Sequence, residues 1–207
     1  MTTVDPQHRV NLAPMGPVLT NPIALSGPDG GDPGFVLRPF QGSRTFANLQ
    51  ATRRATVHVS DDVELFAAAA IGRLGDPADL VRLTADRNWA IMLRCHRWFC
   101  LQITAITQTP PRFEMQCRVV SSGIQDPFFG FNRGKHAVIE AAILATRTHL
   151  ISSDEIQSQL QSLRPLIDKT AGESERRAFD ALVDQINCRS QAAAPSTPPP
   201  TDAGESQ

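Results

Sequence analysis

The sequence has few cysteines, and they do not supply the two close ligand pairs that a structural metal site usually needs. Its 207 residues include Cys95, Cys100, Cys117 and Cys188, and none belongs to a C-x-x-C motif. Cys95, His96 and Cys100 are close in sequence, but a structural zinc site usually offers two close ligand pairs. Cys117 lies in an alternating strand pattern and is typical of a small buried hydrophobe. We therefore expect no metal site, and no disulfide in a chain that we predict to be cytoplasmic.

Long apolar runs and an excess of charge of one sign are also missing. No apolar run approaches the roughly 20 residues of a membrane-spanning helix. Residues Met1 to Asp5 show no basic region followed by an apolar core, as a signal peptide would. There are 20 Lys and Arg against 21 Asp and Glu, and the two signs are interspersed. We therefore expect a protein that binds neither nucleic acid nor a membrane surface.

Motifs of several common enzyme classes are absent as well. The chain contains no G-x-S-x-G, H-E-x-x-H or Walker A sequence. Gly27-Pro-Asp-Gly-Gly31 does not open a helix after a strand, as a dinucleotide-binding motif does. Asp29 and Asp32 stand between glycines, but the remaining ligands of a calcium loop are missing. The sequence therefore names no catalytic residue.

What the sequence does contain is a β-rich body followed by helices. Hydrophobic residues make up 41% of the chain, and 16 prolines with 13 glycines indicate many turns. Alternating apolar residues predict strands at 10–12, 18–25, 35–40, 54–60, 99–107 and 113–119. Helical spacing and capping residues predict helices at 45–52, 63–71, 77–83, 135–150, 152–165, where Pro165 kinks or ends the helix, and 173–189.

These patterns divide the chain into three parts. We expect a barrel-like body at 1–125, a helical extension at 126–189 that packs on it, and a tail at 190–207. The tail is rich in Ala, Pro, Ser and Thr, so it cannot bury enough apolar surface to order itself, and we expect it to be disordered.

The stretch Arg38-Pro-Phe-Gln-Gly-Ser-Arg-Thr-Phe46 lies between a predicted strand and a predicted helix. Backbone N–H groups at a helix N-terminus are unpaired and carry the positive end of the helix dipole. Two hydroxyls, from Ser43 and Thr45, and two guanidiniums, from Arg38 and Arg44, fall at this point. Such a set is typical of a phosphate site, although it also fits a capped helix with two solvated arginines. Without a Walker lysine or metal ligands, it favours a single terminal phosphate over a triphosphate.

Segments on both sides of this corner resemble a known family. They are Asn11-Leu-Ala-Pro-Met-Gly16, the run from Leu37 to Leu49, the run from Val57 to Asp62 with Leu65-Phe66, and Asn132-Arg133 with the run from Val138 to Ile143 and Ala145-Thr-Arg147. In this order they resemble a domain-of-unknown-function family of archaea and some bacteria, which is similar to the FMN-binding split barrels of the flavin reductase type. The resemblance implies a six-stranded Greek-key split β-barrel, here a β-rich α+β fold with a C-terminal helical extension. It also implies a homodimer that holds FMN near the subunit interface.

The resemblance assigns roles to individual residues. Arg38, Ser43, Arg44 and Thr45 would bind the FMN phosphate, and Asn48 would support the ribityl or phosphate region. The flavin would be approached by backbone and apolar contacts from the run Ala13 to Gly16, which includes Met15 and Gly16, and from Pro39 and Phe40.

Two further positions leave alternatives open. His58 departs from the family pattern, which often has Asn in this strand, and it is either a donor to the flavin or a core or solvated histidine. Arg133 and Lys135 would complete the anion site, or else they are surface charges beside a helix cap.

The implied function is that of an FMN-dependent oxidoreductase or flavin reductase-like protein of unknown substrate, with a small-molecule substrate or a nicotinamide donor as partner. Because a flavin performs its own hydride and electron chemistry, no protein acid or base is required. The alternatives are a flavin carrier or sensor without enzymatic activity, and a dimeric assembly module that has lost flavin.

Overall fold

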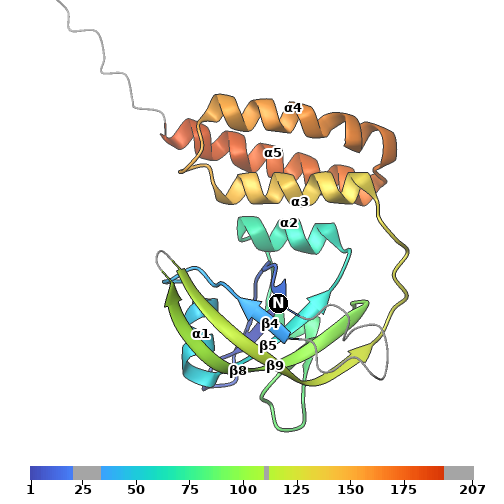
Figure 1. The fold of residues 1–207 in the computed structure, drawn as a ribbon. Coiled ribbons are helices and arrows are strands. Elements are labelled where there is room, and N and C mark those ends of the chain that lie inside the picture. Colours follow the sequence, from blue (N-terminus) through green and yellow to red (C-terminus); the bar gives the residue numbers. More distant parts are fainter. Residues whose placement is uncertain (21–33, 110–111, 194–207) are drawn as a thin grey trace, which may run out of the picture.

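The strand patterns join into one antiparallel sheet, and the helical patterns form a layer stacked on it (Figure 1). The computed structural model describes residues 1–20, 34–109 and 112–193. The turn that we expected at Pro110-Pro111 and most of the loop that we expected at 26–34 lie outside the described residues. No helix in the described ranges is both long and apolar enough to cross a membrane.

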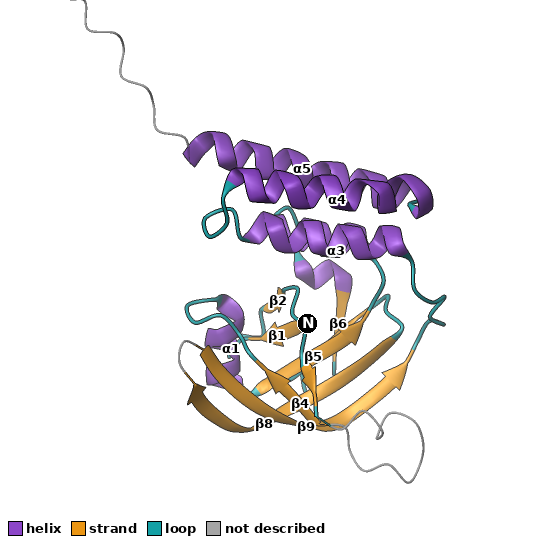
Figure 2. Cartoon of the chain, turned by 45° about the horizontal axis from the view of Figure 1, so that its top comes forward, coloured by secondary structure: helices purple, strands orange, loops and turns teal. Residues whose placement is uncertain are grey.

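The main sheet has seven strands in the order β2-β1-β5-β8-β9-β4-β3, and its neighbours are antiparallel. A second sheet pairs β6 with β7. The strands are β1 Thr2–Val4, β2 Val10–Leu12, β3 Val18–Leu19, β4 Gly34–Leu37, β5 Arg54–Val59, β6 Val81–Leu83, β7 Ala90–Met92, β8 Arg97–Thr109 and β9 Arg112–Ile124. The main sheet curves around its core (Figure 2), but its edge strands β2 and β3 do not pair, so the expected barrel is not closed within the described residues.

The long hairpin of β8 and β9 is the frame of the sheet, with 13 residues in each strand. Register shifts between Cys100 and Leu101 and between Ile103 and Ala105 bend it, as bulges do. The predicted faces of β9 are confirmed, because Met115 is buried against the sheet core while the residue after it is exposed.

The helices are α1 Arg44–Thr52, α2 Val63–Ile71, α3 Arg133–Thr146, α4 Ser153–Thr170 and α5 Glu173–Ala193, with a 3-10 helix at Pro77–Leu80. The helix predicted at 77–83 was wrong beyond that short turn, because β6 starts at Val81. Pro165 does not end α4. It lies on an exposed face, where water can reach the carbonyl of Gln161 that loses its helical hydrogen bond. Helix α5 continues to Ala193, so residues 190–193 are helical rather than disordered.

Two separate cores hold the layers. Leu37, Leu49 and Leu101 belong to the core of the sheet layer. The second core joins α3, α4 and α5 and includes Val63 and Ala67 of α2. Helix α2 follows β5 in sequence, but in space it belongs to the helical layer.

A polar cluster also connects the layers next to α2. Asp61 Oδ2 lies 2.6 Å from Nζ of Lys135 on α3, and Asp61 Oδ1 lies 2.9 Å from Nε2 of His96. The hydrogen bond from Lys135, with a smaller contribution from His96, lowers the pKa of Asp61 below its ordinary value. The loop between β5 and α2 is therefore tied to α3 by charge as well as by packing.

Candidate functional site

The corner between β4 and α1 forms as the sequence predicts. Gly42 has φ +88°, a conformation in which a side chain would be strained, and it turns the chain into the helix. Ser43 is the N-cap, and its hydroxyl accepts the N–H of Phe46 at 3.1 Å. The amides of Arg44 and Thr45 then have no protein acceptor among the described residues. The first turn of α1 has no acidic residue, so its positive end is not neutralised from within the helix.

The two polar side chains that α1 turns inward are already engaged. Thr45 is buried, and its hydroxyl accepts a hydrogen bond from Asn11 Nδ2 at 3.0 Å. Asn48 is also buried, and its Nδ2 donates to the hydroxyl of Thr3 at 3.0 Å. These side chains therefore attach α1 to β1 and β2, which leaves Ser43, Arg44 and the free amides as the groups open to an anion.

The two arginines of the corner have different surroundings. Arg38 Nη2 lies 2.7 Å from Glu114 Oε1 on β9, so its charge is partly compensated. Arg44 is exposed and lines a surface groove together with His8, Arg9 and Arg87. Nothing in the sequence spacing of His8, Arg9 and Arg87 indicates that they reach α1, so their place beside Arg44 depends on the fold. His8 and Arg87 are both in the left-handed region, with φ near 60° (63° and 57°), and His8 Nδ1 lies 3.3 Å from the carbonyl oxygen of Arg87.

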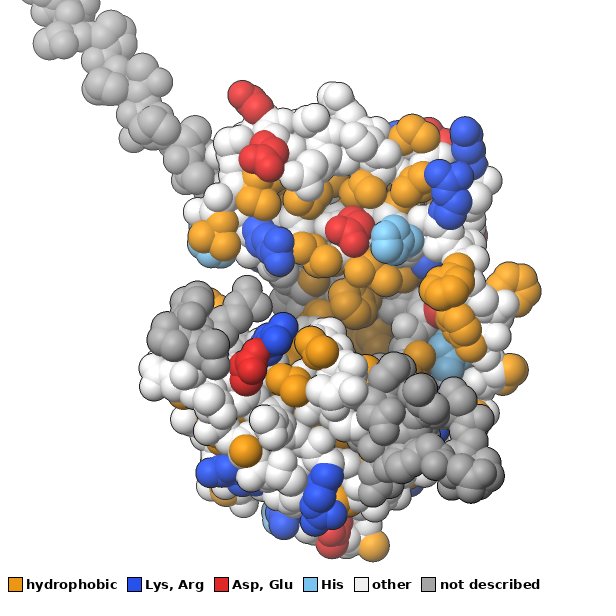
Figure 3. All heavy atoms as spheres, viewed as in Figure 1, with side chains coloured by type: hydrophobic (Ala, Val, Ile, Leu, Met, Phe, Trp, Pro, Cys, Tyr) orange, Lys and Arg blue, Asp and Glu red, His pale blue; other side chains and the backbone are white. Residues whose placement is uncertain are grey.

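A second concave site lies between the sheet layer and α2, and Figure 3 shows a hollow with hydrophobic side chains between the two layers. Its empty volume is about 460 Å³, a figure that includes the open mouth. The residues that line it come from the N-terminal segment, β5, α2 and β7: Met1, Leu12, Ala13, Pro14, Met15, His58, Ser60, Asp62, Leu65, Phe66, Ala69 and Met92. The fold therefore brings together Met15 and His58, two predicted site residues that are far apart in sequence.

His58 has one engaged and one free ring nitrogen. It stands on β5 opposite Trp98, and its Nε2 accepts the backbone N–H of Met92 at 3.1 Å. Its Nδ1 is buried and has no hydrogen-bond partner. Burial, and secondarily the positive charge of the chain N-terminus, lowers the pKa of His58 to about 3. The ring is therefore neutral at pH 7, and because Nε2 accepts, Nδ1 carries the proton.

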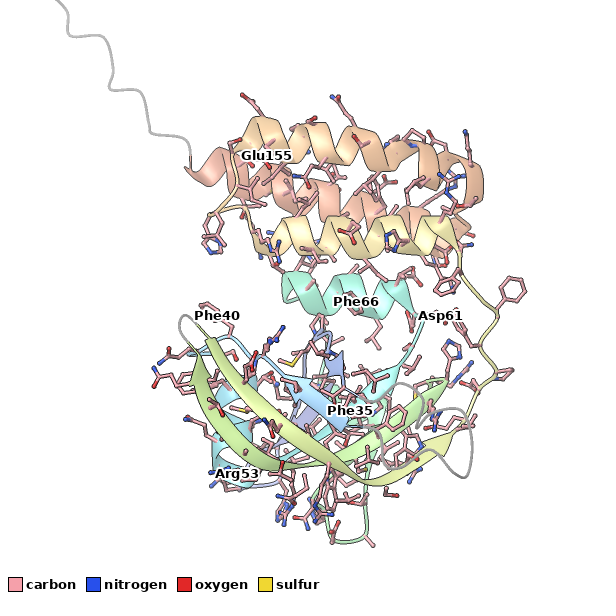
Figure 4. All side chains as sticks on the ribbon, in the orientation of Figure 1. Phe35, Phe40, Arg53, Asp61, Phe66 and Glu155 are labelled. Atoms are coloured by element: carbon pink, nitrogen blue, oxygen red, sulfur yellow. The ribbon has the colours of Figure 1, made fainter. Side chains whose placement is uncertain are left out.

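The other predicted site residues lie neither in the open part of the corner at α1 nor in the pocket under α2 of the same chain. Gly16 is exposed, and Pro39 is buried beneath the corner. Phe40 is 81% exposed, and Figure 4 shows it at the end of the sheet layer, away from Phe66 of α2. Arg133 is exposed at the start of α3, on the opposite side of the molecule from α1 in Figures 1 and 2. Lys135, two residues further on, forms an ion pair with Asp61. Neither Arg133 nor Lys135 therefore contributes to the phosphate site that we predicted at α1 of the same chain.

The described residues contain no group of three or more His, Cys, Asp or Glu side chains placed to hold a metal ion. The thiols of Cys95, Cys100 and Cys117 are buried, and burial raises their pKa values to about 11, 11 and 12. At neutral pH these three thiols are protonated and inert.

Two family models match the chain in succession. The model of the N-terminal domain of a protein family of unknown function, DUF447, matches residues 1–126, and a second DUF447 model matches residues 132–184. Together they extend over most of the sheet layer and most of the helical layer.

Solved structures with similar folds include three of interest. An FMN-bound protein of Methanosarcina mazei, from the same family, is 19% identical, covers 89% of this chain and 93% of its own, and has a TM-score of 0.73. A flavoredoxin of Methanosarcina acetivorans is 10% identical, covering 62% and 69%, with a TM-score of 0.48. A split-barrel protein of Shewanella frigidimarina, described as a flavin reductase, is 12% identical, covering 60% and 65%, with a TM-score of 0.47. At these identities the likeness concerns the fold.

Proposed function

The chain belongs to the DUF447 family of proteins of unknown function, and we propose that it binds FMN with the phosphate at the N-terminus of α1. The FMN carried by the Methanosarcina mazei protein supports this proposal, since both chains have the same fold over nearly their whole length. The finer proposal is that the loaded protein is a flavin reductase-like oxidoreductase that takes electrons from a nicotinamide donor.

The observation that carries the proposal is the open positive end of α1. The amides of Arg44 and Thr45 lack protein acceptors, and the Arg44 guanidinium stands beside them. A phosphate at this point would receive charge-assisted hydrogen bonds, which are about twice as strong as neutral ones. The nearby arginines Arg9 and Arg87 add positive charge to the same groove. The residues present therefore fit a single phosphate group.

The chain's residues hold and orient the cofactor rather than transfer protons. FMN, when bound, supplies hydride and electron transfer. Burial lowers the pKa of His58 to about 3, so this ring stays neutral and is not poised to exchange a proton at neutral pH. The same observation is compatible with a flavin carrier, which needs the binding site and no donor.

The predicted homodimer remains a proposal, and an exposed apolar patch supports it. The patch consists of Ile124, Phe128, Phe129 and Phe131, in the connection from β9 to α3. Phe129 and Phe131 are almost completely exposed, at 95% and 103%. Contiguous exposed aromatic side chains are typical of protein–protein contacts. Light scattering on the wild type and on a Phe129→Ser, Phe131→Ser double variant tests it: a dimer that becomes a monomer supports the patch as the interface.

The test of FMN binding uses the phosphate itself as the probe. Purified protein is titrated with FMN and with riboflavin, which has the same ring and ribityl chain but no phosphate. We expect FMN to bind about 100-fold more tightly than riboflavin, and Arg44→Ala to remove at least tenfold of that difference. Arg164→Ala on α4, an exposed arginine paired with Asp180, serves as the control and leaves the difference unchanged. Thr45 is a poorer target, because its hydroxyl also holds Asn11.

The outcomes of this titration distinguish the three candidate functions: a flavin reductase, a flavin carrier or sensor, and an assembly module. Equal affinity for FMN and riboflavin overturns the phosphate assignment, and failure to bind either leaves only the assembly module. If FMN binds, NADH and NADPH oxidation by the loaded protein distinguishes a reductase from a carrier or sensor.

A further inference from the structure

A groove with basic side chains adjoins the corner at α1. Its lining comes from the β1–β2 loop, β2, the start of α1, and the segment that runs from the 3-10 helix through β6 to the β6–β7 loop. Its volume is about 650 Å³, which lies within the roughly 300–1,000 Å³ of small-molecule sites. Four of the residues that line it carry a guanidinium or imidazole group, and five are apolar. The groove therefore combines positive charge with apolar surface.

Strand β2 shows on which side of the corner the groove lies. Asn11 Nδ2 donates to the hydroxyl of Thr45 in the first turn of α1. The two neighbours of Asn11 line different cavities: Val10 lines the groove, and Leu12 lines the pocket between the sheet layer and α2. Because a strand advances about 3.3 Å per residue, the corner lies between the two cavities. A molecule with its phosphate at the corner can therefore extend into the pocket on one side and into the groove on the other.

Two of the cations in the groove are not compensated by a carboxylate. Arg9 Nε lies 2.6 Å from Asp5 Oδ2, so the charge of this arginine is partly neutralised. Arg44 and Arg87 form no ion pair with any residue that the structure describes. Arg44 belongs to the phosphate site proposed at α1, so Arg87 is the cation that is left for a second anionic group.

A contact between two loops frames the groove. His8 of the β1–β2 loop and Arg87 of the β6–β7 loop meet where His8 Nδ1 lies 3.3 Å from the backbone oxygen of Arg87. In the described ranges, three residues other than glycine have positive φ, and these are two of them. Such conformations are uncommon outside glycine and cluster at functional sites. The contact uses only the backbone of Arg87, so its guanidinium has no hydrogen-bond partner among the described residues.

The rest of the lining selects among anionic ligands. Val10, Ala78 and Leu83 offer apolar surface to a ring. Asp76 also lines the groove, and its Oδ1 accepts the amide of Ala78 at 2.9 Å. The negative charge of Asp76 repels a chain of phosphates, but its carboxylate accepts hydrogen bonds from an amino group. The groove therefore fits one phosphate joined to an uncharged ring with an amino donor, and adenine is such a ring.

We propose that this groove binds an adenylate, with Arg87 as the cation for its phosphate. Two sources offer this chemistry: the adenylate half of FAD, which continues directly from the flavin phosphate, or the 2′-phosphoadenosine end of a separate NADPH molecule. The proposal deepens the proposed function and rests on it, because FAD places its first phosphate at α1 and a nicotinamide donor needs a bound flavin to reduce.

Two arginine variants separate the charge of the groove from net charge. Arg87→Gln removes the proposed cation, and because the contact with His8 uses the backbone, we expect the midpoint of thermal unfolding to stay unchanged. Arg82→Gln is the matched control, because it makes the same change in net charge on β6. Side chains alternate along a strand, so Arg82 faces away from the side on which Val81 and Leu83 line the groove.

The experiment titrates flavin-free protein with FMN and with FAD, and FMN-loaded protein with 2′-AMP. If FAD is the ligand, the wild type binds FAD about tenfold more tightly than FMN, and Arg87→Gln removes this preference while FMN affinity stays within about threefold. If NADPH is the ligand, FAD has no advantage over FMN, and Arg87→Gln weakens the binding of 2′-AMP about tenfold.

The proposal is overturned if Arg87→Gln changes neither the ratio of FAD to FMN affinity nor the affinity for 2′-AMP. It is also overturned if Arg82→Gln lowers either quantity as much as Arg87→Gln does. Failure of the phosphate site at α1 gives a different result, because that site is measured by the ratio of FMN to riboflavin affinity and by its loss in Arg44→Ala.

Discussion

Helices α1 and α2 start in the same way and differ in charge. Each follows a strand, and each is capped by a short side chain that accepts the amide three residues on: Ser43 from Phe46 at 3.1 Å, and Asp62 from Leu65 at 3.0 Å. Each also ends on a residue in the left-handed conformation. By local sequence pattern the two helix starts are nearly equivalent.

The difference lies in what surrounds the first turn. Helix α2 has a carboxylate as its cap and Glu64 in its first turn, so its positive end is neutralised by its own chain. Helix α1 has a neutral cap, no acid in its first turn, and Arg44 beside its free amides. A strand–cap–helix corner is therefore not an anion site by itself, and local charge decides whether one is available to a ligand.

The largest expected effect comes from giving α1 the charge of α2. Arg44→Glu places a carboxylate in the first turn of α1, where it competes with phosphate for the same amides. We expect FMN affinity to fall about 100-fold while riboflavin affinity stays unchanged. The same change stabilises the helix dipole by about 0.3–1 kcal/mol, so thermal stability should not fall.

Arg164→Glu on α4 makes the same change in net charge far from the corner and serves as its control. An FMN affinity within threefold of the wild type in Arg44→Glu would show that α1 is no more an anion site than α2 is.

Removing the two caps gives the next largest effect. Ser43→Ala and Asp62→Ala should each lower the free energy of unfolding by about 1 kcal/mol, because each leaves one helical amide unpaired. Only Ser43→Ala should also lower the ratio of FMN to riboflavin affinity. Chemical denaturation and the two titrations measure both quantities, and a lowered ratio in Asp62→Ala would contradict the contrast between the helices.

The ion pair at the start of α2 should make stability depend on pH. Lys135 lowers the pKa of Asp61 in the folded protein. The contribution of the Asp61–Lys135 pair to the free energy of unfolding is therefore complete above the unfolded carboxyl pKa of about 4. It is lost as the pH falls through the lower, folded pKa. We expect Asp61→Asn to cost about 1 kcal/mol at pH 7 and progressively less below pH 4, as measured by urea unfolding. A cost that does not change with pH would rule out the charge as its origin.

The smallest effect should come from the exposed acid of α2. Glu64 pairs with Arg177 of α5 at 3.0 Å, and both side chains are largely exposed. Glu64→Gln removes this pair and part of the charge at the helix end, so we expect a loss of stability smaller than that of either cap variant, and one that shrinks in high salt. FMN affinity should not change, and if FMN bound more tightly, phosphate would be reaching α2 as well.

The sequence predicts local structure well wherever short-range chemistry decides it. Ser43 and Asp62 cap helices because their oxygens reach an amide three residues away, and Met115 turns inward because strand side chains alternate. Strands β1 and β7 were missed, since three residues carry too little alternation to identify a strand. The helix does not end at Pro165, because a missing helical hydrogen bond costs less on an exposed face.

The candidate site was only half predictable for the same reason. Arg44 and Ser43 are neighbours in sequence, so the corner was visible before the fold. The engagement of Thr45 by Asn11 was not visible, because it depends on where β2 comes to lie.

By itself, the sequence determined the family, the order of most strands and helices, and the composition of the corner at α1, because these depend on short-range contacts and residue type. Only the tertiary structure decided that α2 packs with the helical layer and that Met15 meets His58 in one pocket. It also decided which nitrogen of His58 is a donor, because that depends on the amide of Met92, 34 residues away in the chain. The sequence determines which polar groups the chain carries, but whether each of them is hydrogen-bonded depends on the partners that folding places beside it.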